Sequence, residues 1–197
     1  VVYSLHKFCR LAADGNPTIL GVLFAPMLAG SLVTSRGSRL RERAGWFVSK
    51  RAGRRYLGYM VSQRQRLLGE RGQKRVRRPE LEAMCGYDTK YAMHMLRLGV
   101  QGIEVMRTGA LTLPMADTER DQLMAVRRGK SSLQDVLTWS GELERELKDA
   151  IDASQLPDDA DRTSIASWMR DVYLSDWRSR VPSTLIDAYG DTGVLQP

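Results

Sequence analysis

The chain has 197 residues, of which 30 are Lys or Arg and 23 are Asp or Glu, giving a net charge of +7. Its two cysteines, Cys9 and Cys85, are too few for a disulfide framework, and two histidines add too few ligands for a zinc site. The longest apolar run, residues 18–31, holds two glycines and a proline and is too short to span a membrane, so we expect a soluble, cytoplasmic protein.

Helical periodicity runs through nearly the whole chain. The apolar spacing of residues 5–12 predicts a first helix, Gly15 and Asn16 form a stop signal, and Pro17 suits the start of a second helix. We then expect a loop at 25–36, a long helix at 45–68, a basic loop at 69–78 and a helical turn from Pro79. The next predicted elements are a helix that Asp88 or Thr89 caps and that ends at 107, an extended piece at 110–115 and a helix from Asp117 to Gly129. A capping box of Ser131 and Gln134 then begins a helix with one apolar face that runs to 151, and a linker at 155–161 leads to a last helix at 163–177.

The helix that follows residue 89 is apolar on most of its circumference, so we expect it to be buried. Lys90, His94, Arg97, Gln101 and Glu104 succeed one another at spacings of 4, 3, 4 and 3, which puts them on one stripe. A buried helix with one stripe headed by three potential cations is expected beside a cleft that binds an anion. A simple solvent-exposed edge explains the same stripe equally well.

Charge divides the chain unevenly. Residues 1–80 hold 17 Lys and Arg against 4 Asp and Glu, a balance of +13, and residues 81–197 hold 13 against 19, a balance of −6. A basic first part predicts a surface for nucleic acid or nucleotide phosphate, with Lys50, Arg54 and Arg55 as candidate contacts. The alternative is a solvated helix face without a ligand.

Four short segments carry a family resemblance. Residues 3–20 read YSLHKFCRLAADGNPTIL, and KYAMHMLRL (90–98), TGALTLP (108–114) and RRG (127–129) follow in the same order as in the family. This series resembles the predicted nucleotidyltransferases of the DNA polymerase beta superfamily, in the branch associated with RNA repair and phage genomes. The resemblance covers most of residues 1–175.

The resemblance implies a mainly helical chain, the C-terminal portion of an α+β nucleotidyltransferase, with at most a strand remnant at its start and the extended piece near 110–115. It implies a complete enzyme that transfers a nucleotidyl group from a nucleoside triphosphate to a hydroxyl, possibly on RNA, with Mg²⁺ as cofactor. Phosphate would be held by Lys7, Lys90, His94, Arg97 and, as the weakest candidate, Arg127.

The superfamily's metal-binding carboxylates have no counterpart in this sequence. They form an Asp-x-Asp or Asp-x-Glu pair after a Gly-Ser or Gly-Gly turn, whereas the Gly-Ser pairs at 30–31 and 37–38 precede no such pair. We therefore expect no catalytic or metal residue here, a catalytic segment upstream of residue 1, and no activity from this chain alone. We further expect a basic region at 1–80, a substrate-side region at 81–178 and a tail at 179–197. The alternatives are a helical nucleic-acid-binding module without enzyme activity and a catalytically inactive relative.

Overall fold

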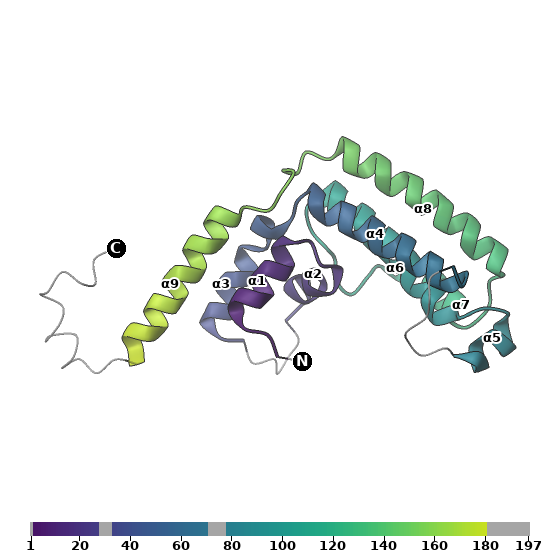
Figure 1. The fold of residues 1–197 in the computed structure, drawn as a ribbon, viewed down its shortest axis with the longest axis horizontal. Coiled ribbons are helices and arrows are strands. Elements are labelled where there is room, and N and C mark those ends of the chain that lie inside the picture. Colours follow the sequence, from purple (N-terminus) through teal and green to yellow (C-terminus); the bar gives the residue numbers. More distant parts are fainter. Residues whose placement is uncertain (1, 28–32, 71–77, 181–197) are drawn as a thin grey trace, which may run out of the picture. The chain divides into compact units, whose positions relative to one another are not determined.

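A computed structural model describes residues 2–27, 33–70 and 78–180. The chain divides into two compact units, Val1–Arg162 and Thr163–Pro197. In chain order the helices are α1 (Leu5–Ala13), α2 (Pro17–Phe24), α3 (Ser35–Glu42), the 3-10 helix η1 (Ala44–Phe47), α4 (Lys50–Leu67), α5 (Pro79–Cys85), α6 (Thr89–Thr108), α7 (Asp117–Arg127), α8 (Leu133–Ala153) and α9 (Arg162–Arg180) (Figure 1).

The described residues contain no strand, which confirms the mainly helical fold class. At the start of the chain, where a strand remnant was allowed, Ser4 instead caps α1 by accepting the N–H of Lys7 at 3.2 Å. The segment at 110–115 is a turn with a cis Leu113–Pro114 bond rather than a strand. None of the described helices is long and apolar enough to cross a membrane.

The first two helices meet at a sharp corner. Gly15 has φ +72°, and a Cβ atom there would lie 2.5 Å from the Cα atom of Ala52 in α4, so both the backbone and the packing require glycine. Asn16 accepts the N–H groups of Thr18 and Ile19 at 3.0 and 3.2 Å, which caps α2. The predicted stop at Gly15 and Asn16 is therefore confirmed.

Three long helices, α4, α6 and α8, form the core of unit 1 and lie side by side (Figure 1). Close contacts of glycines define their directions: Gly102 lies against Tyr56 and Leu147, and Gly99 lies against Met60 and Leu143. Residue numbers rise together in α6 and α8 and in opposite directions in α4 and α6. Thus α6 is parallel to α8 and antiparallel to α4, which puts the carboxyl ends of α6 and α8 beside the amino end of α4.

Several predicted boundaries were wrong. Residues 35–42, where no helix was predicted, form α3, which Thr34 caps by accepting the N–H of Gly37 at 3.1 Å. The long helix predicted from 45 begins as η1 and breaks at Val48 and Ser49 before α4. The capping box of α8 is formed by Ser132 and Asp135, one position after the predicted pair. Most of the predicted basic loop at 69–78 lies outside the described residues, and the boundary at residue 80 stays a prediction.

Candidate anion-binding site

The amino end of α6 is fixed by a buried carboxylate. Asp88 is 4% exposed, and its Oδ1 atom accepts the N–H groups of Lys90 and Tyr91 at 2.9 and 3.1 Å. Its Oδ2 atom accepts a hydrogen bond from Arg78 at 3.0 Å, and the Arg78 guanidinium also lies over the ring of Tyr91. The predicted cap at Asp88 is confirmed, and it fixes the first turn of α6, where the cationic stripe begins.

Lys90 and Arg97 are exposed on α6, and His94 is half-buried between them. One N–H of the Arg97 guanidinium lies 3.0 Å from the Nδ1 atom of His94. Within the described residues, neither Lys90 nor Arg97 forms an ion pair with a carboxylate. The structure thus brings three of the predicted phosphate-binding residues together, and no carboxylate of the described residues neutralises the charges of Lys90 and Arg97.

A third positive charge, that of Arg66 in α4, also acts on His94. Burial, followed by the charges of Arg97, Arg66 and Lys90 in that order, lowers the pKa of His94 to about 4. The imidazole is therefore neutral at pH 7, in a strongly positive environment. No sequence pattern predicted Arg66 as part of this site, because the register between α4 and α6 depends on helix packing rather than on spacing within either helix.

The other end of the stripe has a different character. Glu104 accepts the N–H of Thr112 at 2.8 Å, which holds the turn after α6 against that helix. Tyr56 of α4 is fully buried, and its hydroxyl has no hydrogen-bond partner among the described residues. Burial raises the pKa of Tyr56, the charge of Arg97 lowers it and that of Glu104 raises it, so this hydroxyl faces the stripe.

The two remaining predicted phosphate ligands, Arg127 and Lys7, differ in their position relative to the triad of Lys90, His94 and Arg97. Arg127, at the last turn of α7, donates a hydrogen bond to the Oγ1 atom of Thr89 at 3.1 Å and therefore lies at the amino end of α6. Lys7 is exposed on α1, which packs against α2 and η1, and its ammonium lies 4.8 Å from the ring centre of Tyr3. Arg127 is therefore close to the start of the stripe, whereas Lys7 lies on a different part of the protein surface.

The predicted nucleic-acid contacts lie at the amino end of α4 and are partly engaged within the protein. Arg54 donates to the backbone carbonyl of Asp158 at 3.1 Å, and Arg55 donates to that of Asp14 at 3.3 Å. The backbone N–H of Lys50 donates to the carbonyl of Pro157 at 2.8 Å. The contacts with Pro157 and Asp158 attach the segment at 155–161 to α4, and the contact with Asp14 attaches the end of α1.

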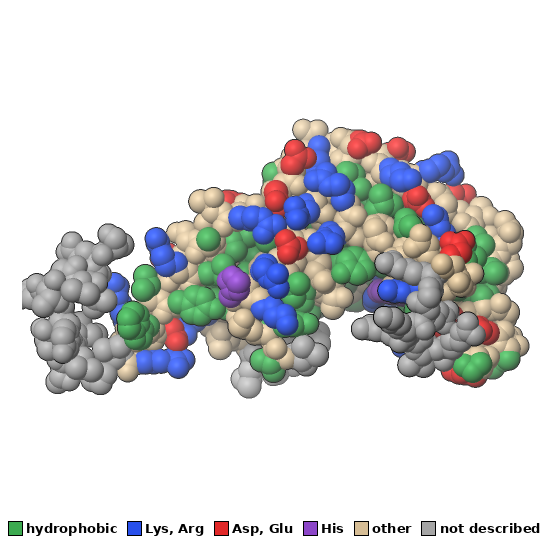
Figure 2. All heavy atoms as spheres, viewed as in Figure 1, with side chains coloured by type: hydrophobic (Ala, Val, Ile, Leu, Met, Phe, Trp, Pro, Cys, Tyr) green, Lys and Arg blue, Asp and Glu red, His purple; other side chains and the backbone are tan. Residues whose placement is uncertain are grey.

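Carboxylates lie among these basic side chains. Asp14 pairs with Arg162 at 2.8 Å, and Asp159 pairs with Arg51 and Arg162 at 3.4 and 3.3 Å. Figure 2 shows Lys and Arg side chains over α1 and the start of α4, with Asp and Glu side chains between them. The excess positive charge of this surface is thus smaller than the sequence balance of residues 1–80 suggests.

The family of this chain follows from the match of a protein-family model to most of its residues. The model of the RNA repair pathway DNA polymerase beta family, RlaP, matches residues 1–171. The chain belongs to the RlaP family. No curated protein and no solved structure matches the chain. The family resemblance read from the four segments is therefore confirmed over almost the same residues.

The RlaP family relationship implies Mg²⁺ as a cofactor. Three or more His, Cys, Asp or Glu side chains with the spacing of a metal site do not come together among the described residues. Asp158, Asp159 and Asp161 form the chain's Asp-x-Asp sequence, but Asp159 is occupied by the two arginine pairs. The described residues therefore do not fit the metal.

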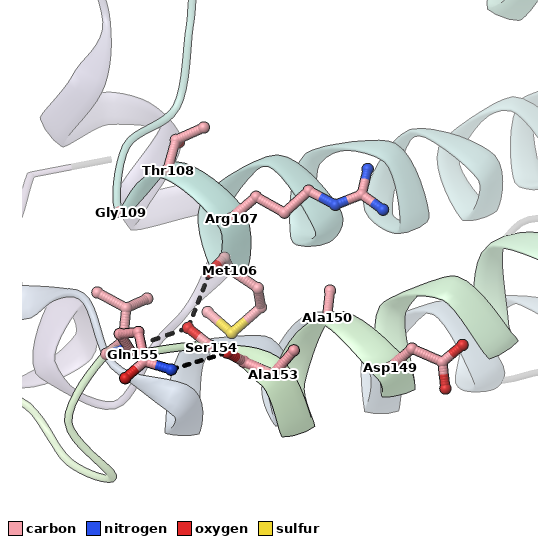
Figure 3. A pocket seen from close by; sticks show the side chains of 10 residues that line it. Met106, Arg107, Thr108, Gly109, Asp149, Ala150, Ala153, Ser154 and Gln155 are labelled. Atoms are coloured by element: carbon pink, nitrogen blue, oxygen red, sulfur yellow. Dashed lines mark hydrogen bonds between the residues drawn. The ribbon is translucent and has the colours of Figure 1, made fainter.

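A hollow of about 550 Å³ lies between the carboxyl ends of α6 and α8 (Figure 3). Its polar groups are largely engaged: Ser154 donates to the carbonyl of Met106 at 2.8 Å, and Gln155 donates to that of Ala153 at 3.2 Å. Arg107 at its edge pairs with Glu146 at 2.8 Å. This hollow is at the opposite end of α6 from Lys90, and neither Lys90, His94 nor Arg97 lines it.

Proposed function

We propose that this chain is the helical, substrate-side part of a nucleotidyltransferase that transfers a nucleotidyl group from a nucleoside triphosphate to a hydroxyl acceptor, with RNA as the candidate acceptor. Family membership supports the nucleotidyl transfer. The observation that carries the role of this chain is the position of His94 among Arg66, Lys90 and Arg97. In this proposal the metal-binding carboxylates come from outside residues 1–197.

The cations of the stripe are suited to phosphate. Arg97 offers a planar fork of N–H donors that can contact two phosphate oxygens, and one of those donors is already directed by His94. Lys90 supplies a mobile point charge at the first turn of α6, where the helix dipole also favours an anion. Arg66 adds positive charge from the neighbouring helix. Together these groups would hold and orient a triphosphate.

The experiment that tests this proposal measures ATP binding to the 197-residue chain by calorimetry. Arg97→Ala is expected to weaken ATP binding by roughly ten- to a hundredfold, as for the loss of a charge-assisted hydrogen bond. Arg107→Ala is the matched control, because Arg107 is an exposed arginine at the far end of the same helix. Equal ATP affinities of the two variants, with circular dichroism unchanged, would remove the proposed role of the stripe.

The second candidate function is binding of single-stranded RNA through the amino end of α4. Arg54 and Arg55 are exposed, and each commits one donor group to a backbone carbonyl, so most of their N–H groups remain available for phosphate. RNA affinity should then fall steeply as salt rises. Replacing Lys50, Arg54 and Arg55 with alanine should reduce the slope of log K against log salt by about 2.

The control for the RNA experiment removes the same charge elsewhere. Alanine at Arg107, Arg120 and Arg145, which are exposed on α6, α7 and α8, lowers the net charge by the same amount. A local RNA site predicts that this control keeps the original salt slope. Equal slopes for the two triple variants would show that only the overall charge matters.

A further inference from the structure

The hydrogen bond between Arg97 and His94 constrains the imidazole. The Nη2 atom of Arg97 lies 3.0 Å from the Nδ1 atom of His94. Because a guanidinium can only donate hydrogen bonds, Nδ1 must accept this one with its lone pair. The ring proton of the neutral imidazole is then on Nε2. Adding a second proton at Nδ1 would remove the acceptor and leave two cations facing each other. In the free protein, His94 therefore holds Arg97 only while it is uncharged.

The surroundings of His94 reinforce this state. Among the described residues, the charges that act on it are Lys90 and Arg97 from α6 itself and Arg66 from α4, and all three are positive. The helices α5, α7 and α8 also pack on α6, but none of the charges that shift the pKa of His94 comes from them. Burial and these cations lower that pKa to about 4. An anion bound among the cations would offset their field and reverse the largest part of their effect on His94.

We propose that His94 is a positioning residue that holds Arg97 in the free protein and takes up a proton when a phosphate-bearing ligand binds, releasing Arg97 to that ligand. This inference rests on the proposed function of the same site and adds its regulation. The proton goes to Nδ1, which Arg97 vacates, and the protonated imidazole becomes an additional donor to the anion. Binding of the anion and binding of the proton then favour each other.

The linkage predicts the direction and size of a pH effect. If the attraction of the bound anion offsets the effect of burial as well as that of the cations and returns the pKa of His94 to its ordinary value of about 6.5, the contribution of His94 to affinity grows about tenfold between pH 7.5 and pH 5.5. The sign follows from the proton count, because the complex binds more protons than the free protein throughout this range. A histidine that only fills space predicts no such change.

The first experiment follows the imidazole directly by NMR. The chain has two histidines, and a His6→Gln variant assigns the remaining ring signals to His94. We expect the pKa of His94 to be close to 4 without ligand and to rise by about two units or more when ATP saturates the protein. An unchanged pKa in the presence of bound ATP overturns the inference while leaving the proposed function in place.

The second experiment counts protons by calorimetry of ATP binding at pH 5.5 in buffers of different ionisation enthalpy. The His94→Gln variant keeps an amide oxygen that can accept from Arg97 but cannot take up a proton. The difference between the original chain and this variant cancels the protonation of ATP itself. We expect a difference approaching one proton, and no difference overturns the inference.

The two proposals fail in different ways. Absence of ATP binding to the original chain at both pH values removes the proposed function, and the inference with it. Binding with equal proton uptake removes the inference alone. If the His94→Gln variant does not fold, the NMR titration of the original histidine remains the deciding measurement.

Discussion

Gly53 of α4 lies directly against Met106 near the end of α6. A Cβ atom on Gly53 would collide with the Sδ atom of Met106 and would lie 2.7 Å from the Cγ1 atom of Ile151 in α8. A side chain of any size at position 53 would thus separate all three core helices. Gly53 therefore allows the amino end of α4 to pack closely against the carboxyl ends of α6 and α8.

Gly53→Ala is expected to destabilise the protein by about 1–3 kcal/mol, because the added methyl group enters a fully packed seam. The control is Gly58→Ala in the same helix, where an added Cβ atom meets nothing within 4 Å. Alanine is the better helix former, so this control should be about 0.5–1 kcal/mol more stable than the original chain. Urea unfolding monitored by circular dichroism measures both. A loss at position 58 as large as that at 53 would contradict the packing argument.

The second prediction concerns the buried carboxylate at the start of α6. Asp88→Ala removes two helix-capping hydrogen bonds and leaves Arg78 without its partner, and it should cost about 2–4 kcal/mol. Asp88→Asn keeps an oxygen for the two N–H groups and loses only the ion pair, so it should cost less than half as much. Thermal unfolding of the two variants separates capping from charge. Equal losses would mean that the ion pair with Arg78 contributes nearly all of the effect.

About half of the site could be predicted from the sequence. The spacing of Lys90, His94 and Arg97 was sufficient to put them on one stripe, since helical geometry alone determines which residues share a face. Arg66 could not be predicted in the same way, because its position depends on how α4 slides along α6. That register is determined by the fit of Gly99 and Gly102 against Met60 and Tyr56, which no periodicity reveals.

For the fold too, features that depend on nearby residues were predicted and features that depend on distant residues were not. Helices that cap themselves, such as α6 with Asp88, were predicted with nearly correct ends, because the signal lies within a few residues. The start of α4 was wrong because Ser49 makes no side-chain cap and the amino end is completed by Pro157 and Asp158. Such long-range partners leave no trace in local patterns.

The third prediction concerns Glu144 of α8, which pairs with Arg64 of α4 and with Lys148 of its own helix. Hydrogen bonds to Glu144 from Lys148 and then from Arg64 outweigh burial and lower its pKa. A carboxyl with a lowered pKa stabilises the folded state above its unfolded pKa of 4.5, and this contribution is lost as pH falls through the lower folded value. Glu144→Gln should therefore be about 1 kcal/mol less stable than the original chain at pH 7 and equally stable in strong acid.

The control for this pH series is Glu142→Gln, an exposed position in the same helix. Its unfolding free energy should follow that of the original chain at every pH. A constant difference between Glu144→Gln and the original chain, from neutral pH into strong acid, would show that the loss comes from packing rather than from charge.

The fourth prediction concerns the buried thiol of α1. Burial raises the pKa of Cys9 to about 11 from an ordinary 9.0, and only the thiolate reacts with iodoacetamide. In a Cys85→Ser variant at pH 8, alkylation of Cys9 should therefore be about a hundredfold slower than that of the same chain unfolded in urea. Mass spectrometry follows the modification. Equal rates in the folded and unfolded chain would show that the amino end of α1 opens readily.

The contacts at the start of α4 have a consequence for the order in which the protein is made. The backbone N–H groups of Lys50 and Arg51 are satisfied by the carbonyls of Pro157 and Asp158, more than a hundred residues later in the chain. On the ribosome, α4 emerges long before these residues, so its first turn remains incomplete while α6, α7 and α8 are synthesised. Closure of this end of the bundle must therefore wait until Pro157 and Asp158 have emerged, after all three helices of the core have been synthesised.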